Sequence, residues 1–348
     1  MSKSLQTEMV QAGVHSLAEM PDYVSVPKVP PIYMSSVFSF DDVPSLDAVY
    51  AKEAPGYVYS RDGNPGTDYT ASMIAQAEGG ESGLVFSSGM AAILQSIIAY
   101  VGKGDHIVSS PVLYGGVYNY LKNEATRFGV ETTFADFTDM AAVEAAIKPN
   151  TKILYTETIT NPLMEVFDLK AIAEIAHKHG CKLIVDNTFA SPAVCKPLEL
   201  GADIVADSST KYMGGHSDIT GGAVVTTPEL IAPVKRGLAM YGPVMSPFDA
   251  WLMARSLRTL DMRVARHSEN ALKVAEFLEK HPKIEKVHYP GLASYTTSLS
   301  YPAKTSHRAY NEEELKAAGI TMGTLRFSIG LEEPEDIIAE FDEALNKL

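Results

Sequence analysis

The sequence predicts an α/β protein with a large, mostly parallel sheet, and three observations lead to this prediction. Short apolar runs alternate with amphipathic segments between about residues 80 and 226. The runs, such as Leu84-Val85-Phe86, are continuously apolar, which is typical of parallel strands covered on both faces. The chain has 348 residues, enough for a large core and about two domains.

Seven strands are expected in the large domain, at residues 84–86, 106–109, 131–135, 152–156, 182–186, 203–206 and 222–226. Between them, helices are expected to begin at Met90 and to cover residues 117–128, 140–147 and 169–179. Beyond Pro247 one long helical stretch reaches Glu279. It leads to a smaller C-terminal α+β domain with strands at 286–290 and 324–329 and a closing helix at 333–348. We therefore expect an N-terminal arm at residues 1–60, a large domain at 61–256 and a C-terminal domain at 257–348.

The arm is rich in proline. The run from Val26 to Tyr33 contains Pro27, Pro30 and Pro31, which remove backbone donors and bias their neighbours to extended conformations. An arm of this kind packs on another surface, and in an oligomer that surface can belong to a neighbouring subunit.

Composition excludes several classes of partner. The net charge of −14 argues against nucleic acid and against an anionic membrane surface. Two cysteines without a CxxC pair provide neither a disulfide framework nor the spacing of a metal site, which favours a reducing cytoplasm and no metal. The start of the chain lacks the apolar core of a signal peptide, and the apolar stretch Met90–Val101 is too short to span a bilayer.

Lys211 is the most informative residue. It follows the strand at 203–206 in the sequence Ser208-Ser209-Thr210-Lys211, and open α/β sheets bind ligands at the carboxyl ends of their strands. A lysine amine there can form a Schiff base with an aldehyde cofactor, and hydroxyls beside it can bind a phosphate. The alternative is a surface lysine in a loop.

Two other segments are candidates for contact with a cofactor. Asp186 ends a buried strand, where it either caps the next turn or pairs with the nitrogen of a pyridinium ring. Ser88-Gly89-Met90 lies between a strand and a helix, where free N–H groups favour an anion, although Ser88 also fits a simple helix cap. With Ser208 and Thr210 this segment would form a phosphate cup.

Further candidates are an aromatic residue and two arginines. Tyr114 precedes Gly115 and Gly116, so its ring can lie on a cofactor ring and its hydroxyl can move protons; the alternative is a buried structural tyrosine. Arg61, in the segment Tyr59-Ser60-Arg61, suits a phosphate or carboxylate, or is an exposed loop arginine. Arg326 lies in an expected strand, where a substrate carboxylate or a structural acid would satisfy it. No GxGxxG motif and no framed P-loop is present.

Taken together, these segments resemble the pyridoxal-phosphate enzymes of cysteine and methionine metabolism, the family of cystathionine γ-synthase, the cystathionine lyases and methionine γ-lyase. The matching pieces are Pro30–Tyr33, Tyr59–Arg61, Gly63–Pro65, Glu78–Glu81, Ser87–Met90, Leu113–Gly116, Glu157-Thr158, Asn161-Pro162, Val185–Thr188, Ser208–Asp218 and Tyr289–Leu292. Their order and spacing fit from about residue 22 to Thr297 and again from Ser298 to the end.

The resemblance implies a fold-type I architecture, pyridoxal 5'-phosphate as the cofactor and a homotetramer of two active dimers. It implies Lys211 as the Schiff-base lysine, Asp186 on the pyridine nitrogen and Tyr114 stacked on the ring. The other roles it implies are phosphate binding by Gly89, Met90, Ser208 and Thr210, phosphate binding from the partner subunit by Tyr59 and Arg61, and substrate binding by Arg326 with Asn161 nearby.

The chain departs from the family pattern in two places. Residues Gly66–Ala71 replace the usual Thr and the Leu-Glu pair that follow Asn-Pro. In addition, Thr297 and Ser298 join two parts that the family separates by several dozen residues, which normally supply strands and a specificity loop. We expect that stretch to be omitted from the sequence rather than lost from the fold.

Three functions remain open from the sequence. The first is a lyase on sulfur-containing amino acids, which eliminates a thiol and leaves a 2-oxo acid and ammonia. In it Lys211 moves protons at the substrate carbons and Tyr114 protonates the departing thiol. The second is γ-replacement on an O-acylhomoserine. The third is a non-enzymatic assembly subunit. Gly116 favours the cystathionine enzymes, because many methionine γ-lyases carry cysteine there.

Overall fold

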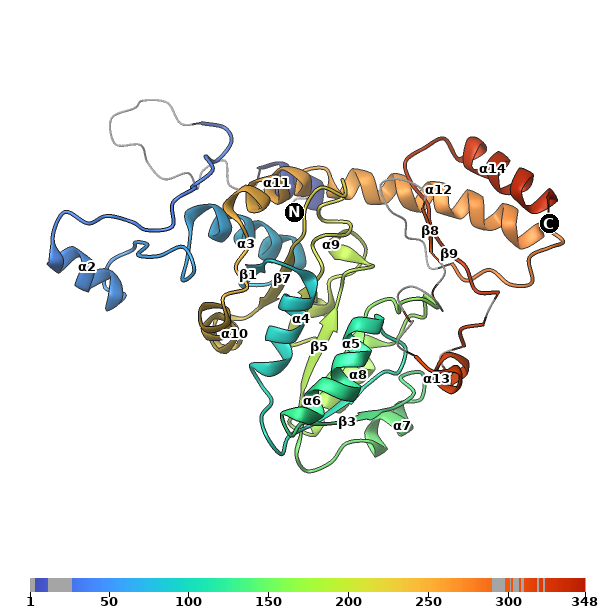
Figure 1. Ribbon diagram of the computed structural model, residues 1–348, viewed down its shortest axis with the longest axis horizontal. Helices are drawn as coiled ribbons and strands as arrows, with labels where there is room; N and C mark the ends of the chain where they lie inside the picture. The colour runs from blue at the N-terminus through green and yellow to red at the C-terminus, as the bar shows by residue number, and fades with distance from the viewer. Residues whose placement is uncertain are drawn as a thin grey trace.

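The computed structural model of the protein (Figure 1) describes residues 4–11, 27–289, 298–300, 302, 307, 310–317, 319–321 and 323–347. The large α/β domain lies in the middle of Figure 1. The N-terminal arm with α2 (Val43–Tyr50) extends from one side, and the C-terminal elements lie on the other.

The described residues of the large domain contain a seven-stranded sheet with the order β1-β7-β6-β5-β4-β2-β3. The strands are β1 (Ser82–Phe86), β2 (His106–Ser109), β3 (Glu131–Phe134), β4 (Thr151–Glu157), β5 (Lys182–Asp186), β6 (Ile204–Asp207) and β7 (Gly222–Thr226). Only β7 runs against its neighbours, pairing antiparallel with both β1 and β6. The predicted mostly parallel seven-stranded sheet is therefore confirmed.

Helices cover both faces of this sheet, because alternate residues of each strand point to opposite sides. In β5, Ile184 packs into the core under α4, whereas Leu183 and Val185 pack into the core under α8. The helices of the large domain are α3 (Pro65–Glu78), α4 (Gly89–Ile98), α5 (Gly115–Asn119), the π-helical turn η1 (Tyr120–Glu124), α6 (Ala125–Arg127), α7 (Met140–Ala145), α8 (Leu169–Lys178), α9 (Ser191–Val194), the 3₁₀ turn η2 (Pro197–Leu200), α10 (Pro228–Tyr241) and α11 (Pro247–Leu257).

The long helix predicted beyond Pro247 is in fact two helices, α11 and α12 (Leu260–Lys280), so the single-helix prediction is wrong. The end of α11 leaves carbonyl groups without partners inside the helix. The buried Arg263 side chain satisfies one of them, donating to the Ser256 carbonyl over 3.0 Å.

The C-terminal elements are β8 (Ser298–Ser300), α13 (Glu312–Ala317), β9 (Arg326–Ser328) and α14 (Pro334–Asn346). α14 packs on α12 through Val274, Leu278 and Ile337. The strand predicted at 286–290 is absent from 286–289, and Pro290 lies outside the described residues. An extended segment becomes a strand only when a neighbour accepts its hydrogen bonds, and the described small sheet contains only β8 and β9.

The N-terminal arm has two parts. α1 (Leu5–Gln11) packs on its own chain, with Met9 fully buried and Gln6 Nε2 donating to the Arg258 carbonyl over 3.2 Å. Residues 27–60 lie on the outside of the large domain, and α2 contains no buried residue. Contact between this second part and a partner subunit stays a prediction.

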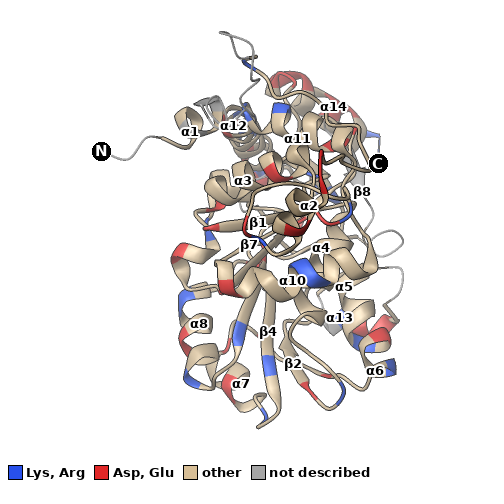
Figure 2. Ribbon diagram, turned by 90° about the vertical axis from the view of Figure 1, so that its left-hand side faces the viewer, with Lys and Arg blue, Asp and Glu red and all other residues tan. Residues whose placement is uncertain are grey.

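Acidic and basic residues are interspersed over the side drawn in Figure 2. In the part of the chain that is described, no helix has both the length and the apolar character needed to cross a bilayer. The same residues contain no group of three or more His, Cys, Asp or Glu side chains arranged to hold a metal ion.

Candidate active site

Three neighbouring parallel strands end in buried carboxyl groups at one edge of the sheet. β4 ends at Glu157, β5 at Asp186 and β6 at Asp207, and Glu157 lies directly opposite Asp186 in the register of the sheet. Lys211 follows β6 in the adjoining loop. The strand-end pattern of the sequence therefore places its predicted residues at one edge, where α/β sheets bind ligands.

The loop that carries Lys211 is held from both sides. The Lys211 N–H donates to the Ser208 carbonyl over 3.0 Å, and the Gly215 N–H donates to the Lys211 carbonyl over 2.7 Å. From α12, the guanidinium of Arg263 donates to the carbonyl of Tyr212 over 2.7 Å. The Lys211 side chain is nevertheless open to solvent on one side, so its amine can meet a small molecule.

The Lys211 amine has a shifted acidity. Partial desolvation, and then the positive charge of Arg326, lower the pKa of Lys211 below its ordinary value. A lowered pKa increases the fraction of free amine near neutral pH, which is the form that attacks an aldehyde or accepts a proton.

Asp186 is buried and only partly satisfied. Its Oδ1 accepts the Thr188 N–H over 2.9 Å, but the Tyr155 hydroxyl lies 3.5 Å from Oδ2, which is long for a hydrogen bond. Burial raises the pKa of the Asp186 carboxyl, so the ionised form needs a positive partner. A protonated pyridine nitrogen fits that need.

The predicted phosphate cup is assembled at the start of α4. The Ser88 hydroxyl caps this helix by accepting the Ala91 N–H over 3.2 Å. A Cβ added to Gly89 would lie 2.4 Å from Ser208 Cβ, so glycine alone lets the helix start and Ser208 face each other this closely. The Thr210 hydroxyl is bonded to Gly221, accepting its N–H over 2.8 Å. Gly89, Met90 and Ser208 thus lie where an anion is favoured by the helix N-terminus.

Tyr114 immediately precedes α5 and is 41% exposed. Its backbone N–H donates to Glu157 Oε1 over 2.6 Å. A Cβ added to Gly116 would come within 2.7 Å of the Tyr114 ring and 3.3 Å of Met90 Sδ. The ring therefore lies against Gly116 and beside the start of α4, and it is partly exposed to solvent.

Arg326 enters the site from the C-terminal elements. Its Nη1 donates to Asn161 Oδ1 over 2.7 Å, and its guanidinium lies 5.5 Å from the centre of the Phe189 ring. Its Nε is buried and has no hydrogen-bond partner among the described residues. A planar guanidinium with an unused donor suits a carboxylate, as the sequence predicted for the substrate.

Tyr59 and Arg61 are not brought to this edge of their own chain. Both are exposed, the Arg61 guanidinium lies 5.7 Å from the centre of the Tyr59 ring, and its Nη1 donates to the Ala239 carbonyl. Within the described residues neither forms a hydrogen bond or ion pair with Lys211 or Ser208. Their predicted reach into a partner's site is a proposal taken up below.

Sequence reasoning missed three residues of the site. Thr188 links Asp186 to Ser208, because its hydroxyl accepts the Ser208 N–H over 2.7 Å. Glu157 binds the N–H groups of Tyr114 and Asn161. His307 is buried against the carbonyls of the same two loops. Glu157 shared the strand-end signal that identified Asp186, whereas no local pattern marks His307.

Comparison with known proteins identifies the family. The sequence profile of the Cys/Met metabolism PLP-dependent enzymes matches residues 6–298 and 294–346. The chain belongs to this family. The match divides at the join between Thr297 and Ser298, which lies at the edge of the described residues.

Curated relatives and solved structures agree with this assignment. The chain is 40% identical to the L-methionine gamma-lyase of Porphyromonas gingivalis, over 91% of this chain and 92% of that protein. It is 37% identical to the cystathionine gamma-synthase/O-acetylhomoserine (thiol)-lyase of Bacillus subtilis, over 99% and 97%. The structure of an O-acetylhomoserine (thiol)-lyase from Campylobacter jejuni, containing a pyridoxyl-lysine phosphate, matches with a TM-score of 0.92 at 27% identity. The match covers 99% of this chain and 100% of that one.

The family enzyme therefore uses pyridoxal 5'-phosphate in the metabolism of sulfur amino acids. The residues present fit that group, because Asp186 is a buried carboxyl whose pKa is raised by burial, and Gly89 places no side chain between the start of α4 and Ser208. The fold-type I architecture is that of the solved structures it matches.

Proposed function

We propose that the enzyme is a lyase that acts on sulfur-containing amino acids of the methionine, homocysteine or cystathionine type. With water, it would convert the substrate to a 2-oxo acid, ammonia and a thiol, by α,γ- or α,β-elimination. The observation that carries this proposal is the meeting of Lys211, Asp186, Tyr114 and the Arg326–Asn161 pair at one edge of the sheet.

Bound pyridoxal phosphate supplies the aldehyde that captures an amine and the ring that takes up electrons released at the α-carbon. Asp186 would hold the ring nitrogen protonated. Gly89, Met90, Ser208 and Thr210 would bind the phosphate, with the Thr210 hydroxyl turning from the Gly221 carbonyl to do so.

The substrate would be oriented by its carboxylate. Arg326 offers its unused Nε beside Nη1, which already bonds Asn161, so the carboxylate would lie between this arginine and Lys211. Lys211, with its lowered pKa, would then accept the α-proton and deliver a proton at a neighbouring carbon. The Tyr114 hydroxyl would donate the proton that the departing thiolate needs.

A second candidate is γ-replacement on an O-acylhomoserine. It is favoured by the 37% identity to the Bacillus subtilis synthase over 99% of this chain. Both reactions use the same early proton transfers and differ in whether a thiol leaves or is added. Gly116 does not distinguish them, although its close approach to the Tyr114 ring leaves no room for the cysteine of many methionine γ-lyases.

We also propose that the active unit is a dimer, within a tetramer of two dimers. Exposed apolar residues on the arm and near α10 support this proposal, since large apolar patches mark interfaces. They are Met34, Val37, Tyr50, Tyr59, Met240 and Tyr241. In this dimer Tyr59 and Arg61 would contact the phosphate bound by the partner. A cytoplasmic location remains a prediction, supported by two unpaired cysteines.

One experiment tests the function and separates the two candidates. The purified protein supplied with pyridoxal phosphate is expected to show visible absorbance that Lys211→Ala abolishes. Incubation with cystathionine and with O-acetylhomoserine plus cysteine, scoring 2-oxo acid against thioether, then assigns the reaction. Thioether as the sole product would overturn the lyase proposal. A colourless wild-type protein would overturn both candidates and leave the assembly role.

A further inference from the structure

We propose that Glu157 and His307 are positioning residues that clamp together the two loops carrying Tyr114 and Asn161. The inference rests on the proposed function, in which Tyr114 lies on the cofactor and Asn161 lies beside the substrate carboxylate. Neither Glu157 nor His307 has a role in the proton transfers described above.

Glu157 holds the N–H groups. Its Oε1 accepts the Tyr114 N–H over 2.6 Å, and its Oε2 accepts the Asn161 N–H over 2.9 Å. The side chain is 4% exposed, so water cannot replace either bond readily. One carboxylate thus fixes the distance between the two loops.

His307 holds the carbonyl groups of the same two places. Its Nε2 lies 2.9 Å from the Leu113 carbonyl and 3.0 Å from the Asn161 carbonyl, and the residue is 1% exposed. With two carbonyl acceptors, Nε2 carries the hydrogen and shares it. The peptide group between Leu113 and Tyr114 is therefore held at its oxygen by His307 and at its nitrogen by Glu157.

Asn161 is held in the same way. Its N–H bonds to Glu157, its carbonyl to His307 and its side-chain oxygen to Arg326. A shift of either clamp residue would move the Tyr114 ring and the carboxylate site together. Displacements of this kind are costly to catalysis, because proton transfer depends on close placement.

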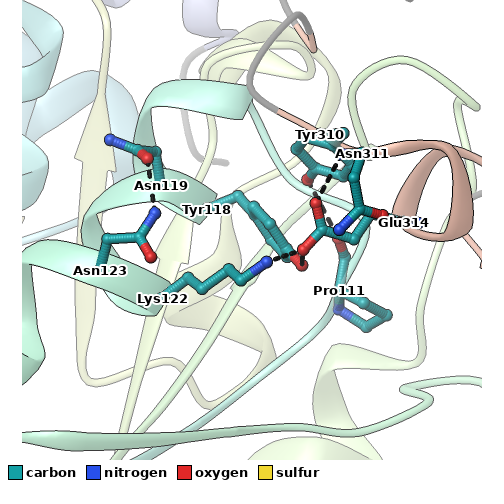
Figure 3. A network of polar contacts seen from close by, with 8 residues as sticks. All are labelled: Pro111, Tyr118, Asn119, Lys122, Asn123, Tyr310, Asn311 and Glu314. Carbon is teal, nitrogen blue, oxygen red and sulfur yellow. Dashed lines mark hydrogen bonds and ion pairs between the residues drawn. The ribbon is translucent and has the colours of Figure 1, made fainter.

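His307 reaches the site because the segment after it is docked on the large domain, as Figure 3 shows. The Tyr310 hydroxyl donates to the Pro111 carbonyl over 3.3 Å, and Glu314 pairs with Lys122 and accepts the Tyr118 hydroxyl over 3.2 Å. The Tyr310 ring packs on His307 with centroids 4.9 Å apart. Docking and clamping use different side chains. Glu314 bonds to Lys122, Tyr118 and Asn311, and Tyr310 still holds the segment on the large domain when Glu314 is replaced.

The test compares His307→Leu, which removes the donor, with His307→Gln, which keeps an N–H, and with Glu314→Gln, which weakens docking only. The first readout is hydrogen–deuterium exchange of residues 112–116 and 159–163 in the full chain without cofactor. We expect exchange in both loops to rise by about tenfold in His307→Leu and in Glu157→Gln. His307→Gln restores protection in part, and Glu314→Gln leaves both loops close to the wild type.

The second readout is turnover with pyridoxal phosphate bound. We expect kcat to fall by about 10- to 100-fold in His307→Leu, with Gln restoring much of it. The change in the temperature of unfolding should stay similar to that of Glu314→Gln. Equal exchange and equal kcat in His307→Leu and Glu314→Gln would overturn the clamp. Hydrogen–deuterium exchange needs neither cofactor nor substrate. An absence of turnover in the wild-type protein would therefore contradict the proposed function, while the exchange measurement would still test the clamp.

Discussion

At the scale of single residues, the site is dominated by carboxyl groups buried at one edge of the sheet. Glu157, Asp186 and Asp207 end three adjacent strands, and Glu78 lies beside Asp207. Burial raises the pKa of each of these carboxyl groups. A carboxylate that is ionised at this edge therefore needs a positive partner, and a protonated cofactor ring would supply one.

Replacing Asp186 by Asn should weaken the grip on the cofactor. A hydrogen bond to a charged group contributes about 1.5–3 kcal/mol, so affinity for pyridoxal phosphate is expected to fall by about 10- to 100-fold. Titration of the absorbance of bound cofactor measures this change. Thr188→Val is the milder comparison, since it keeps the carboxylate. An unchanged affinity in Asp186→Asn would contradict the placement of the ring nitrogen.

Glu78 and Asp207 predict a dependence of stability on pH. Neither oxygen of Asp207 has a hydrogen-bond donor among the described residues, so the two carboxyl groups are satisfied by sharing a proton. Burial raises the pKa of Glu78 to about 8 from an ordinary value of 4.5. The folded protein then binds more protons than the unfolded chain between these values, so its stability falls as pH rises through this range.

Asp207→Asn should reduce that loss by the part that Asp207 contributes, while the part that comes from the burial of Glu78 remains. At pH above about 8 the variant is expected to unfold at a higher temperature than the wild type, because it no longer buries two negative charges. Near pH 5 the unfolding temperature of the variant should be equal to or lower than that of the wild type. Thermal unfolding from pH 5 to 9 checks both statements, and parallel curves for the two proteins would refute them.

The sequence identified the residues whose position follows from strand ends and loop chemistry, namely Lys211, Asp186 and the Ser88–Gly89 turn. It missed His307 because that role depends on contact with residues 146 and 194 positions earlier in the chain. Separations of this kind leave no periodic or local trace. Thr188 was quoted as part of a motif, but its link between two loops appears only in three dimensions.

At the scale of elements, the start of α4 is the feature on which the proposed phosphate cup depends. Gly89→Ala would place a methyl group 2.4 Å from Ser208 Cβ and 2.5 Å from its hydroxyl oxygen. We expect loss of cofactor binding with helix α4 intact, since alanine is a good helix former. Absorbance titration measures cofactor binding, and far-ultraviolet circular dichroism measures the helix content. Retained binding would show that the cup has room to spare.

Helix α12 secures the loop of Lys211 through Arg263. Its guanidinium satisfies the carbonyls of Tyr212, Met213 and Ser256 from a buried position. Arg263→Met removes the guanidinium donors from these carbonyls, of which Ser256 keeps the N–H and the hydroxyl of Thr259. The variant should lower the free energy of unfolding by about 3 kcal/mol.

The neighbouring Arg266 is the matched control on the same helix. It pairs with Glu333 near the surface, so Arg266→Met should cost less than about 1 kcal/mol. Denaturant unfolding of both variants gives the comparison. An equal decrease in the free energy of unfolding for both variants would mean that Arg263 contributes through the packing of its aliphatic chain and not through its hydrogen bonds.

Element boundaries show where sequence patterns stop being sufficient. Most strands of the large sheet were predictable because they are continuously apolar and buried, whereas β1 and β3, which lie at the two edges of the sheet, are only partly buried. The segment 286–289 alternates polar Lys286 and His288 with Val287 and Tyr289, yet it forms no strand, because pairing depends on a neighbour that the described small sheet lacks. The break between α11 and α12 also escaped prediction, since no proline or glycine marks it.

At the scale of the whole molecule, the proposal that two subunits share each site leads to a quantitative prediction. Lys211→Ala and Arg61→Ala should each be inactive alone. After mixing and subunit exchange, half of the dimers are hybrids, and each hybrid has one site with both native residues. About a quarter of wild-type activity should return, as the two-fold symmetry of a dimer requires.

The control for this experiment is a mixture of Lys211→Ala with Asp186→Asn. Lys211 and Asp186 of one site come from the same chain. Each site of the hybrid therefore contains one of the two substitutions. No activity should therefore return. Recovery in neither mixture would indicate that Arg61 serves its own chain or none.

Among the described residues of the last fifty, His307 bonds to the Leu113 and Asn161 carbonyls and Arg326 bonds to the Asn161 side chain, while Lys211, Asp186 and the start of α4 belong to the sheet domain. Substitutions in these C-terminal residues can therefore change the preferred substrate while Lys211, Asp186 and the start of α4 stay unchanged. This division makes the fold a suitable starting point for exchanging C-terminal segments between enzymes that catalyse the same type of reaction on different substrates.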